Sequence, residues 1–123
     1  MPKKLIYICS PFRGNYEENT KNARTFCEVV IKYFPDTIPI APHLYFPQFL
    51  DDTNPTERSL GMESGIALLD KCDEIWVYGL GIESEGMRAE IEYAEKHGIP
   101  IRDGYECTTT GLFERIKEQK NVE

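Results

Sequence analysis

The pattern of apolar residues along the chain predicts short strands separated by helices. The runs 4–9 and 74–79 are almost continuously apolar, which is typical of strands covered on both faces in a parallel sheet. The run 37–41 contains an internal proline and is therefore expected at a sheet edge, and 99–102 predicts a fourth short strand. This alternation favours an α/β protein.

Apolar residues at helical spacing occupy the intervals between these strands. From about 16 to 34 they recur at i, i+3, i+4, i+7, i+8 and i+11, after Asn15 and Glu18, which form an N-cap and its capping-box partner. Residues 54–70 begin with a second asparagine cap and predict another helix. A charged terminal helix is predicted over 111–120.

Two features depart from routine linkers and helices. The segment 42–52 is rich in proline and aromatic residues, which is typical of a lid or a pocket wall. Gly61, Ser64 and Gly65 lie in the middle of a predicted helix, although glycine there costs about 1 kcal/mol relative to alanine. These small residues indicate that another helix or a ligand approaches closely.

The segment 75–94 has the pattern of a strand, a glycine-rich loop and a helix that begins near Met87. The unpaired N–H groups and the dipole at a helix N-terminus favour anions, and Gly86 allows a ligand to approach the main chain. Glu90 is expected about one turn into this helix, where its ionised form is favoured. An ionised carboxylate can act as a nucleophile or as an electrostatic stabiliser.

The 123 residues suit a single domain, 1–123. We predict a three-layer α/β/α sandwich, similar to Rossmann and flavodoxin folds, with a parallel sheet of four to five strands in the order 2-1-3-4(-5). In that order the switch point falls between the first and third strands. The loop after Cys9 and the loop after Gly79 therefore meet at the natural binding site.

Charge and hydropathy narrow the classes of partner. The net charge is −7 and there is no basic stripe, which makes polymeric nucleic acid an unexpected partner. No apolar run approaches the roughly 18 residues of a membrane span, and the run 5–9 is too short for a signal peptide. We therefore expect a cytoplasmic protein with no membrane partner.

No metal or cofactor is predicted. The cysteines are far apart and form no CxxC pair, so buried free thiols are expected. They are Cys9, Cys27, Cys72 and Cys107. His43 and His97 have no partners at the spacing of a metal site or a catalytic triad.

Two motifs resemble the nucleoside 2-deoxyribosyltransferase superfamily, which includes the 2′-deoxynucleoside 5′-monophosphate N-hydrolases. They are the loop Ser-Pro-Phe-Arg-Gly at 10–14 and the pattern Ser-Glu-Gly-Met-Arg-Ala-Glu-Ile-Glu-Tyr-Ala at 84–94. The region 4–102 as a whole is compatible, and the chain looks like a small DUF4406-like branch of that superfamily. The resemblance implies a nucleoside deoxyribosyltransferase-like domain.

The resemblance also implies roles for individual residues. Glu90 matches the family nucleophile, which attacks the anomeric carbon of a deoxyribose, and Tyr7 matches a tyrosine near that carboxylate. Ser84 matches a serine that contacts the 5′-phosphate in the monophosphate hydrolases. Ser10 and Arg13 match a serine and an arginine that also face this phosphate. The resemblance therefore favours a 5′-phosphorylated substrate.

Further residues complete the predicted site. Gly14, Gly86 and Met87 belong to the two loops that would hold the phosphate. His43, Tyr45, Phe46 and Phe49 are candidates for the base pocket, because aromatic rings stack bases. Each position also has a structural interpretation: the serines can cap a turn or a helix, and the aromatic run can belong to the core or to a subunit contact.

The chain departs from the family in one respect. Family members usually carry an aspartate on the helix before the third strand, where this chain has Met-Glu-Ser-Gly-Ile at 62–66. Glu63 is the nearest acid and could replace the aspartate from a shifted turn. Asp51, Asp52 and Glu83 are other candidates for assisting departure of the base.

Three hypotheses follow from the sequence. The first is an N-glycoside hydrolase or deoxyribosyltransferase-like enzyme acting on a nucleotide, and the second is a nucleotide-binding or sensing module without turnover, which suits the missing aspartate. The third is a subunit in which the glycine-rich loop is only a tight turn. The resemblance implies a small nucleotide or nucleoside as partner and a homodimer or larger homo-oligomer, in which one subunit completes its neighbour's pocket.

Overall fold

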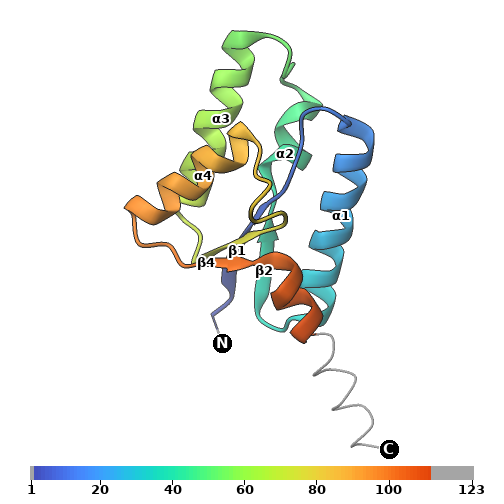
Figure 1. Ribbon diagram of the computed structural model, residues 1–123, viewed down its shortest axis with the longest axis vertical. Helices are drawn as coiled ribbons and strands as arrows, with labels where there is room; N and C mark the ends of the chain where they lie inside the picture. Colours follow the sequence, from blue (N-terminus) through green and yellow to red (C-terminus); the bar gives the residue numbers. More distant parts are fainter. Residues whose placement is uncertain (1, 112–123) are drawn as a thin grey trace, which may run out of the picture.

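Four parallel strands form the centre of the protein, in the order β2-β1-β3-β4 (Figure 1). The structure is a computed structural model that describes residues 2–111. The strands are β1 (Lys4–Cys9), β2 (Thr37–Ile40), β3 (Glu74–Val77) and β4 (Ile101–Asp103). The predicted strand order is confirmed, and the proline-containing strand β2 lies at the sheet edge as expected.

Helices connect the strands. They are α1 (Tyr16–Tyr33), α2 (Pro42–Tyr45), the short 3₁₀ helix η1 (Phe46–Gln48), α3 (Pro55–Leu69) and α4 (Glu85–Lys96), followed by a helical segment at 104–111. The side chain of Asn15 accepts a hydrogen bond from the Glu18 N–H, and that of Asn54 accepts two from the first turn of α3. Both predicted N-caps are thus confirmed.

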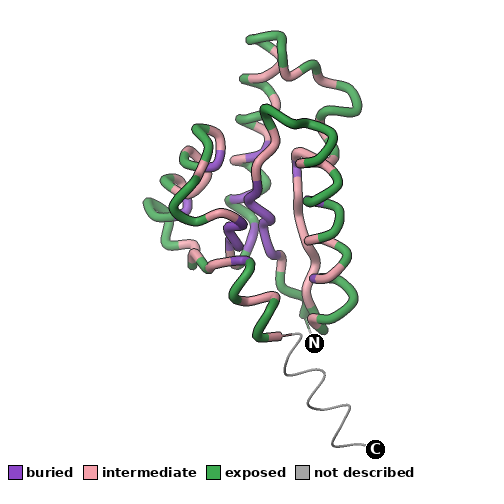
Figure 2. Tube along the Cα trace, turned by 45° about the vertical axis from the view of Figure 1, so that its right-hand side comes forward, coloured by how far each residue is buried: buried purple, intermediate pink, exposed green. Residues whose placement is uncertain are grey.

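Alternate side chains of the strands divide the core between the two faces of the sheet. Ile6 and Ile8 of β1 face α1 and the segment 104–111, whereas Tyr7 and Cys9 face α3 and α4. The most buried residues lie along the strands between these helical layers (Figure 2). The three-layer α/β/α architecture is therefore confirmed, and it places Tyr7 on the same side of the sheet as α4.

The structure also bears on the cysteines and on the length and polarity of the helices. All four cysteines are free, but only Cys9 and Cys72 are buried, while Cys27 and Cys107 are partly exposed. Within residues 2–111, no helix combines the length and the apolar character that a membrane crossing requires.

The last described helix begins earlier than the sequence predicts. Residues 104–111 are helical, and the Asp103 side chain accepts hydrogen bonds from the N–H groups of Tyr105 and Glu106. Three consecutive threonines at 108–110 lower helix propensity, and the sequence pattern therefore did not predict a helix over these residues. Beyond residue 111, the predicted helix 111–120 lies outside the described residues.

Gly104 allows this helix to pack directly on Tyr78, a fully buried aromatic residue. A Cβ atom at position 104 would lie 2.6 Å from the Tyr78 ring. We expect Gly104→Ala to lower the free energy of unfolding by about 1–3 kcal/mol, because the added methyl group overpacks this contact. Urea denaturation would measure the change.

Gly61→Ala is the matched control, because a Cβ atom at position 61 meets only the Leu50 side chain, at 3.6 Å. This second variant should be neutral or up to about 1 kcal/mol more stable, as alanine favours a helix interior. Equal stability of the two variants would show that the Gly104 contact is not tight.

Candidate active site

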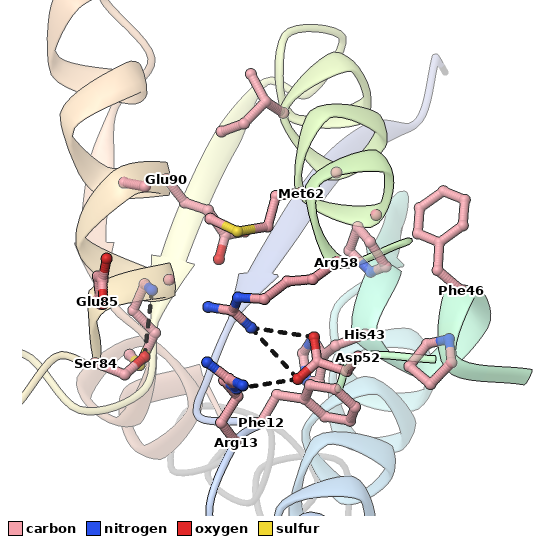
Figure 3. Close-up of a pocket in the computed structure, with 18 of the residues that line it drawn as sticks. Phe12, Arg13, His43, Phe46, Asp52, Arg58, Met62, Ser84, Glu85 and Glu90 are labelled. Carbon is pink, nitrogen blue, oxygen red and sulfur yellow. Dashed lines mark hydrogen bonds and ion pairs between the residues drawn. The ribbon is translucent and has the colours of Figure 1, made fainter. Parts of the chain in front are cut away.

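A cavity of about 350 Å³ opens at the carboxyl ends of β1 and β3 (Figure 3). Cys9 pairs with Val77 in the sheet, so the loops that follow these two strands start side by side. Their residues line the cavity together with α3, α4 and the segment 42–52. The volume is in the range of small-molecule pockets. The predicted switch-point location is confirmed, and 42–52 is indeed a pocket wall.

Glu90 and Tyr7 form the carboxylate side of the cavity. Glu90 is the sixth residue of α4 and points into the cavity (Figure 3), and Tyr7 of β1 lines the same cavity and is hydrogen-bonded to Glu90. Burial raises the pKa of Glu90 to about 7, and hydrogen bonding with the Tyr7 hydroxyl opposes this rise. Burial and the charge of Glu90 together raise the pKa of Tyr7 well above its usual value.

The expectation that Glu90 favours its ionised form is therefore wrong. The residue lies beyond the first turn of α4, and the Met87 N–H of that turn is already bonded to Ser84 Oγ. Loss of hydration outweighs the hydrogen bond with Tyr7, and the effect of the helix dipole falls off beyond the first turn. Near pH 7, comparable fractions of Glu90 are protonated and ionised.

A small residue on α3 makes room for Tyr7. A Cβ atom at position 65 would lie 3.4 Å from the Tyr7 hydroxyl and 3.8 Å from Pro42, so Gly65 is close to both. The predicted close approach to the small residues of α3 is confirmed at Gly65, where the helix α2 approaches through Pro42 and the strand β1 through Tyr7. Tyr7 and Pro42 both line the cavity.

Ser10 and His43 form a second polar pair in the cavity wall. Ser10 Oγ and His43 Nε2 are 3.0 Å apart, and the serine is 6% exposed. Burial lowers the pKa of His43 to about 4, so its imidazole is neutral at pH 7. The ring of Phe12 lies beside His43, with 5.9 Å between the ring centroids. Within the described chain, no group of three or more His, Cys, Asp or Glu is arranged to hold a metal ion.

Asp52 joins two arginines on the wall opposite α4 (Figure 3). Arg13 Nε lies 3.1 Å from Asp52 Oδ2, and Arg58 Nη1 lies 3.1 Å from Oδ1 and 3.3 Å from Oδ2. The Tyr16 hydroxyl donates to Oδ2 at 2.9 Å. The arginine predicted to face phosphate therefore lines the cavity, paired with a carboxylate.

The sequence interpretation missed Arg58. It lies one turn before Gly61 and Met62 and two turns before Gly65, on one face of α3, and all four residues line the cavity. Gly61 and Gly65, which the sequence analysis singled out, already indicate this face of the helix. Extending the same helical spacing toward the N-terminus would have added Arg58.

The helix N-terminus contributes Ser84, Gly86 and Met87 to the cavity lining, as expected. Ser84 Oγ accepts a hydrogen bond from the Met87 N–H at 3.3 Å, so the serine is the N-cap of α4. Its structural role is thus present whether or not it contacts a ligand. Met87 is buried, and Phe46 of the predicted base pocket also lines the cavity.

Other predicted residues lie elsewhere. Glu63 is exposed and outside the cavity, because it is two residues from Gly65 and therefore points about 200° away on the helix. Tyr45 is 59% exposed and packs edge-to-face on Phe46 and Phe49, outside the cavity. Gly14 lies in the exposed turn before α1. The remaining acid candidates outside the cavity are Asp51 and Glu83.

The site thus combines a carboxyl group that titrates near neutral pH with a cationic wall. Glu90 projects from α4, the guanidinium groups of Arg13 and Arg58 project from the opposite side, and apolar groups such as Phe46 and Met62 lie between and around them. Such a cavity can accept a molecule with an anionic group at one end and an apolar part beside it.

Comparison with known proteins supports the fold. A solved structure of a 2-deoxyribosyltransferase from the psychrotolerant bacterium Bacillus psychrosaccharolyticus superposes with a TM-score of 0.62 and 16% sequence identity, over 79% of this chain and 69% of that one. No curated protein matches the sequence. A family model matches residues 4–104, but it is the model of DUF7768 and not that of the DUF4406-like branch that the sequence resembles. The chain therefore belongs to the family described as Domain of unknown function (DUF7768).

Proposed function

We propose that this protein is an enzyme that cleaves the base from a (deoxy)nucleoside 5′-monophosphate, with Glu90 as the carboxylate nucleophile. The observation that carries the proposal is the hydrogen-bonded pair of partly buried Glu90 and buried Tyr7, which faces a cavity of about 350 Å³ with two arginines on its opposite wall. The fold likeness to a 2-deoxyribosyltransferase supports the same class of chemistry. The proposed enzyme is an N-glycosidase or a deoxyribosyltransferase.

The proposed reaction has two steps. In the first, a Glu90 carboxylate oxygen bonds to C1′ of the sugar, while the C1′–N bond breaks and its electron pair leaves with the base, which takes up a proton from solvent. In the second, a water oxygen attacks C1′, releases its proton to solvent and returns the ester electron pair to Glu90. A second base in place of water makes the reaction a transfer. Both steps pass through an oxocarbenium-like state.

The environment of Glu90 suits this role. A carboxylate in a poorly hydrated site is more reactive toward a developing cation than one in water, because the electrostatic attraction is less screened. The Tyr7 hydroxyl stabilises the ionised form by hydrogen bonding, so that an ionised fraction persists at pH 7. Tyr7 therefore also favours departure of Glu90 in the second step.

The cavity suggests an orientation for the substrate. In the proposed complex, the phosphate lies toward Arg13, Ser10 and the N-terminus of α4 capped by Ser84, and the base lies against the apolar wall that includes Phe46. The partner would be a small nucleotide or nucleoside. A homodimer or larger homo-oligomer, which the superfamily resemblance implies, can be tested by light scattering.

A nucleotide-binding module without turnover is the second candidate. It is favoured by the part of α3 where the family aspartate is expected, residues 62–66, because Met62, Gly65 and Ile66 line the cavity there and Glu63 does not. The acids that line the cavity from the ends of the helices are Glu57 on α3 and Glu85 on α4. Asp52, the acid candidate that does line the cavity, is already bound by two arginines. General acid help typically contributes 10²–10⁴-fold, so a site without it would bind a nucleotide and turn it over slowly or not at all.

Chromatography of free base distinguishes these candidates. The purified protein would be incubated with each deoxynucleoside 5′-monophosphate and with each unphosphorylated nucleoside. Release of base from the monophosphates alone is expected. Release from neither, together with a melting temperature raised by a nucleotide, would replace the enzyme by the binding module. No release and no thermal shift would reject both functions.

A further inference from the structure

We infer that Arg58 is an anion-binding residue of this site and that Asp52 positions it together with Arg13, forming a receptor for the phosphoryl group of a phosphomonoester. The inference deepens the proposed function and rests on it for the nature of the rest of the ligand. It concerns Arg58, to which neither the sequence resemblance nor the family match gives a role, and Asp52, which the sequence offered only as a candidate for assisting departure of the base.

The hydrogen-bonding capacity of Asp52 is largely used. Its Oδ2 atom is approached by Arg13 Nε, Arg58 Nη1 and the Tyr16 hydroxyl, and its Oδ1 atom by Arg58 Nη1. The carboxylate is also mostly buried, with 19% of its side chain exposed. Asp52 is therefore a fixed anchor between three separate segments: the loop after β1, α1 and α3.

The guanidinium group of Arg58, by contrast, has donors to spare. An arginine has five N–H donors in a rigid fork, and within residues 2–111 the hydrogen bonds of Arg58 to Asp52 involve Nη1 alone. The guanidinium group is directed into the cavity, beside Arg13 (Figure 3). Its Nε and Nη2 sides are the natural partners of a phosphate or carboxylate.

The charge of the cluster defines the class of anion. Within the cluster, two guanidinium groups and one carboxylate leave one net positive charge. The other acidic residues of the cavity lining, Glu57, Glu85 and Glu90, are not part of this cluster, so the positive charge is local to the two arginines. A phosphomonoester carries about −1.5 to −2 at pH 7 and matches this charge. A free sugar or nucleoside carries no charge and lacks this charge-assisted attraction to Arg58.

Asp52 also orders the two arginines, and this ordering favours anion binding although the negative charge of Asp52 itself disfavours it. Arg13 is 52% exposed, and without the shared carboxylate the two guanidinium groups would repel each other and Arg13 would be free to turn into solvent. Holding both groups in place reduces the ordering cost of binding an anion. Removal of this negative charge should therefore weaken anion binding, although bulk electrostatics predicts that it strengthens binding.

Calorimetry with 2-deoxyribose 5-phosphate and 2-deoxyribose tests the receptor without any turnover. The wild-type protein should bind the phosphate and not the free sugar. Arg58→Gln should weaken phosphate binding about 10- to 100-fold, the range for loss of a charged hydrogen-bond partner. Asp52→Asn should weaken it about 3- to 10-fold, and Arg58→Lys should restore only part of the affinity lost in Arg58→Gln.

Two variants serve as controls. Glu92→Gln changes an exposed carboxylate and Arg88→Gln removes an exposed arginine, both on α4; neither residue lines the cavity, so both variants should bind like the wild type. Thermal melting identifies any variant that fails to fold. If Arg58→Gln does not fold, the phosphate affinity of Arg58→Lys, which keeps the charge and the packing of the stem, tests the role of the guanidinium group.

The outcomes separate this inference from the proposed function. Unchanged phosphate binding by Arg58→Gln, or tighter binding by Asp52→Asn, would overturn the inference even if base release is observed. Absence of phosphate binding by the wild type would do the same. The expected pattern of binding without any base release would support the receptor and reject the enzyme.

Discussion

Replacement of Glu90 by glutamine is expected to slow base release by a factor on the order of 10³ or more, while nucleotide binding changes by less than about threefold. Glutamine has nearly the shape of glutamate and fits the same space above Tyr7, but its amide cannot form the glycosyl ester. Single-turnover assays with the monophosphates that the wild-type protein cleaves would measure the loss, and calorimetry would measure the binding.

Glu92→Gln provides a control on the same helix, because Glu92 is exposed and does not line the cavity. This variant should retain the wild-type rate. Glu90→Asp retains the charge but withdraws the carboxylate by one methylene group, so it should retain binding and lose most of the rate. Base release by Glu90→Gln at the wild-type rate would exclude Glu90 as the nucleophile.

Local sequence signals were sufficient for most of the fold. The apolar runs of β1 and β3 require cover on both faces, and the caps Asn15 and Asn54 define helix starts through hydrogen bonds within one turn. These signals need no knowledge of distant residues. The strand order then followed from general rules of α/β connection, and the structure confirms it.

The helix at 104–111 shows where local signals fail. Its threonines favour other conformations, but the Cys107 side chain packs among the buried residues of one sheet face and Gly104 contacts Tyr78. A β-carbon at Gly111 would meet the ring of Phe34. Tertiary packing therefore overrides propensity here, and packing of this kind cannot be inferred from spacing along the chain.

The candidate site was predictable in position but only partly in composition. The ends of β1 and β3 had to adjoin, which brought Ser10 and Arg13 to the same cavity as Glu90. The pairing of Asp52 with Arg58 depends on how the segment 42–52 folds back on α3, and no short-range pattern specifies it. The direction of Glu63 likewise followed from the exact phase of α3.

The protonation of Glu90 is the clearest case of a property set by tertiary structure. The helix dipole is local and favours the ionised form, whereas desolvation comes from cavity walls contributed by several segments. The second effect is larger, and it raises the pKa of Glu90 from 4.5 to about 7. This has a consequence for stability that is independent of any substrate.

Wild-type protein is expected to lose stability relative to Glu90→Gln as the pH rises. Because the pKa of Glu90 is higher in the folded protein than in the unfolded chain, the folded state binds this proton more tightly. The contribution of protonated Glu90 to the free energy of unfolding is fully present below about pH 4.5 and is lost as the pH rises through about 7. At about 1.4 kcal/mol per pH unit, the loss is about 3 kcal/mol.

Urea denaturation of both proteins at intervals from pH 4.5 to pH 8.5 would measure this difference. The difference between the two free energies of unfolding should be constant below about pH 4.5, change by about 3 kcal/mol in favour of Glu90→Gln up to about pH 7, and be constant again above that. Neutral His43 has a lowered pKa and gains stability over part of this range, but it is present in both proteins and cancels. A difference that stays constant from pH 4.5 to pH 8.5 would mean that Glu90 is well hydrated, and the buried carboxyl on which the nucleophile proposal depends would then be absent.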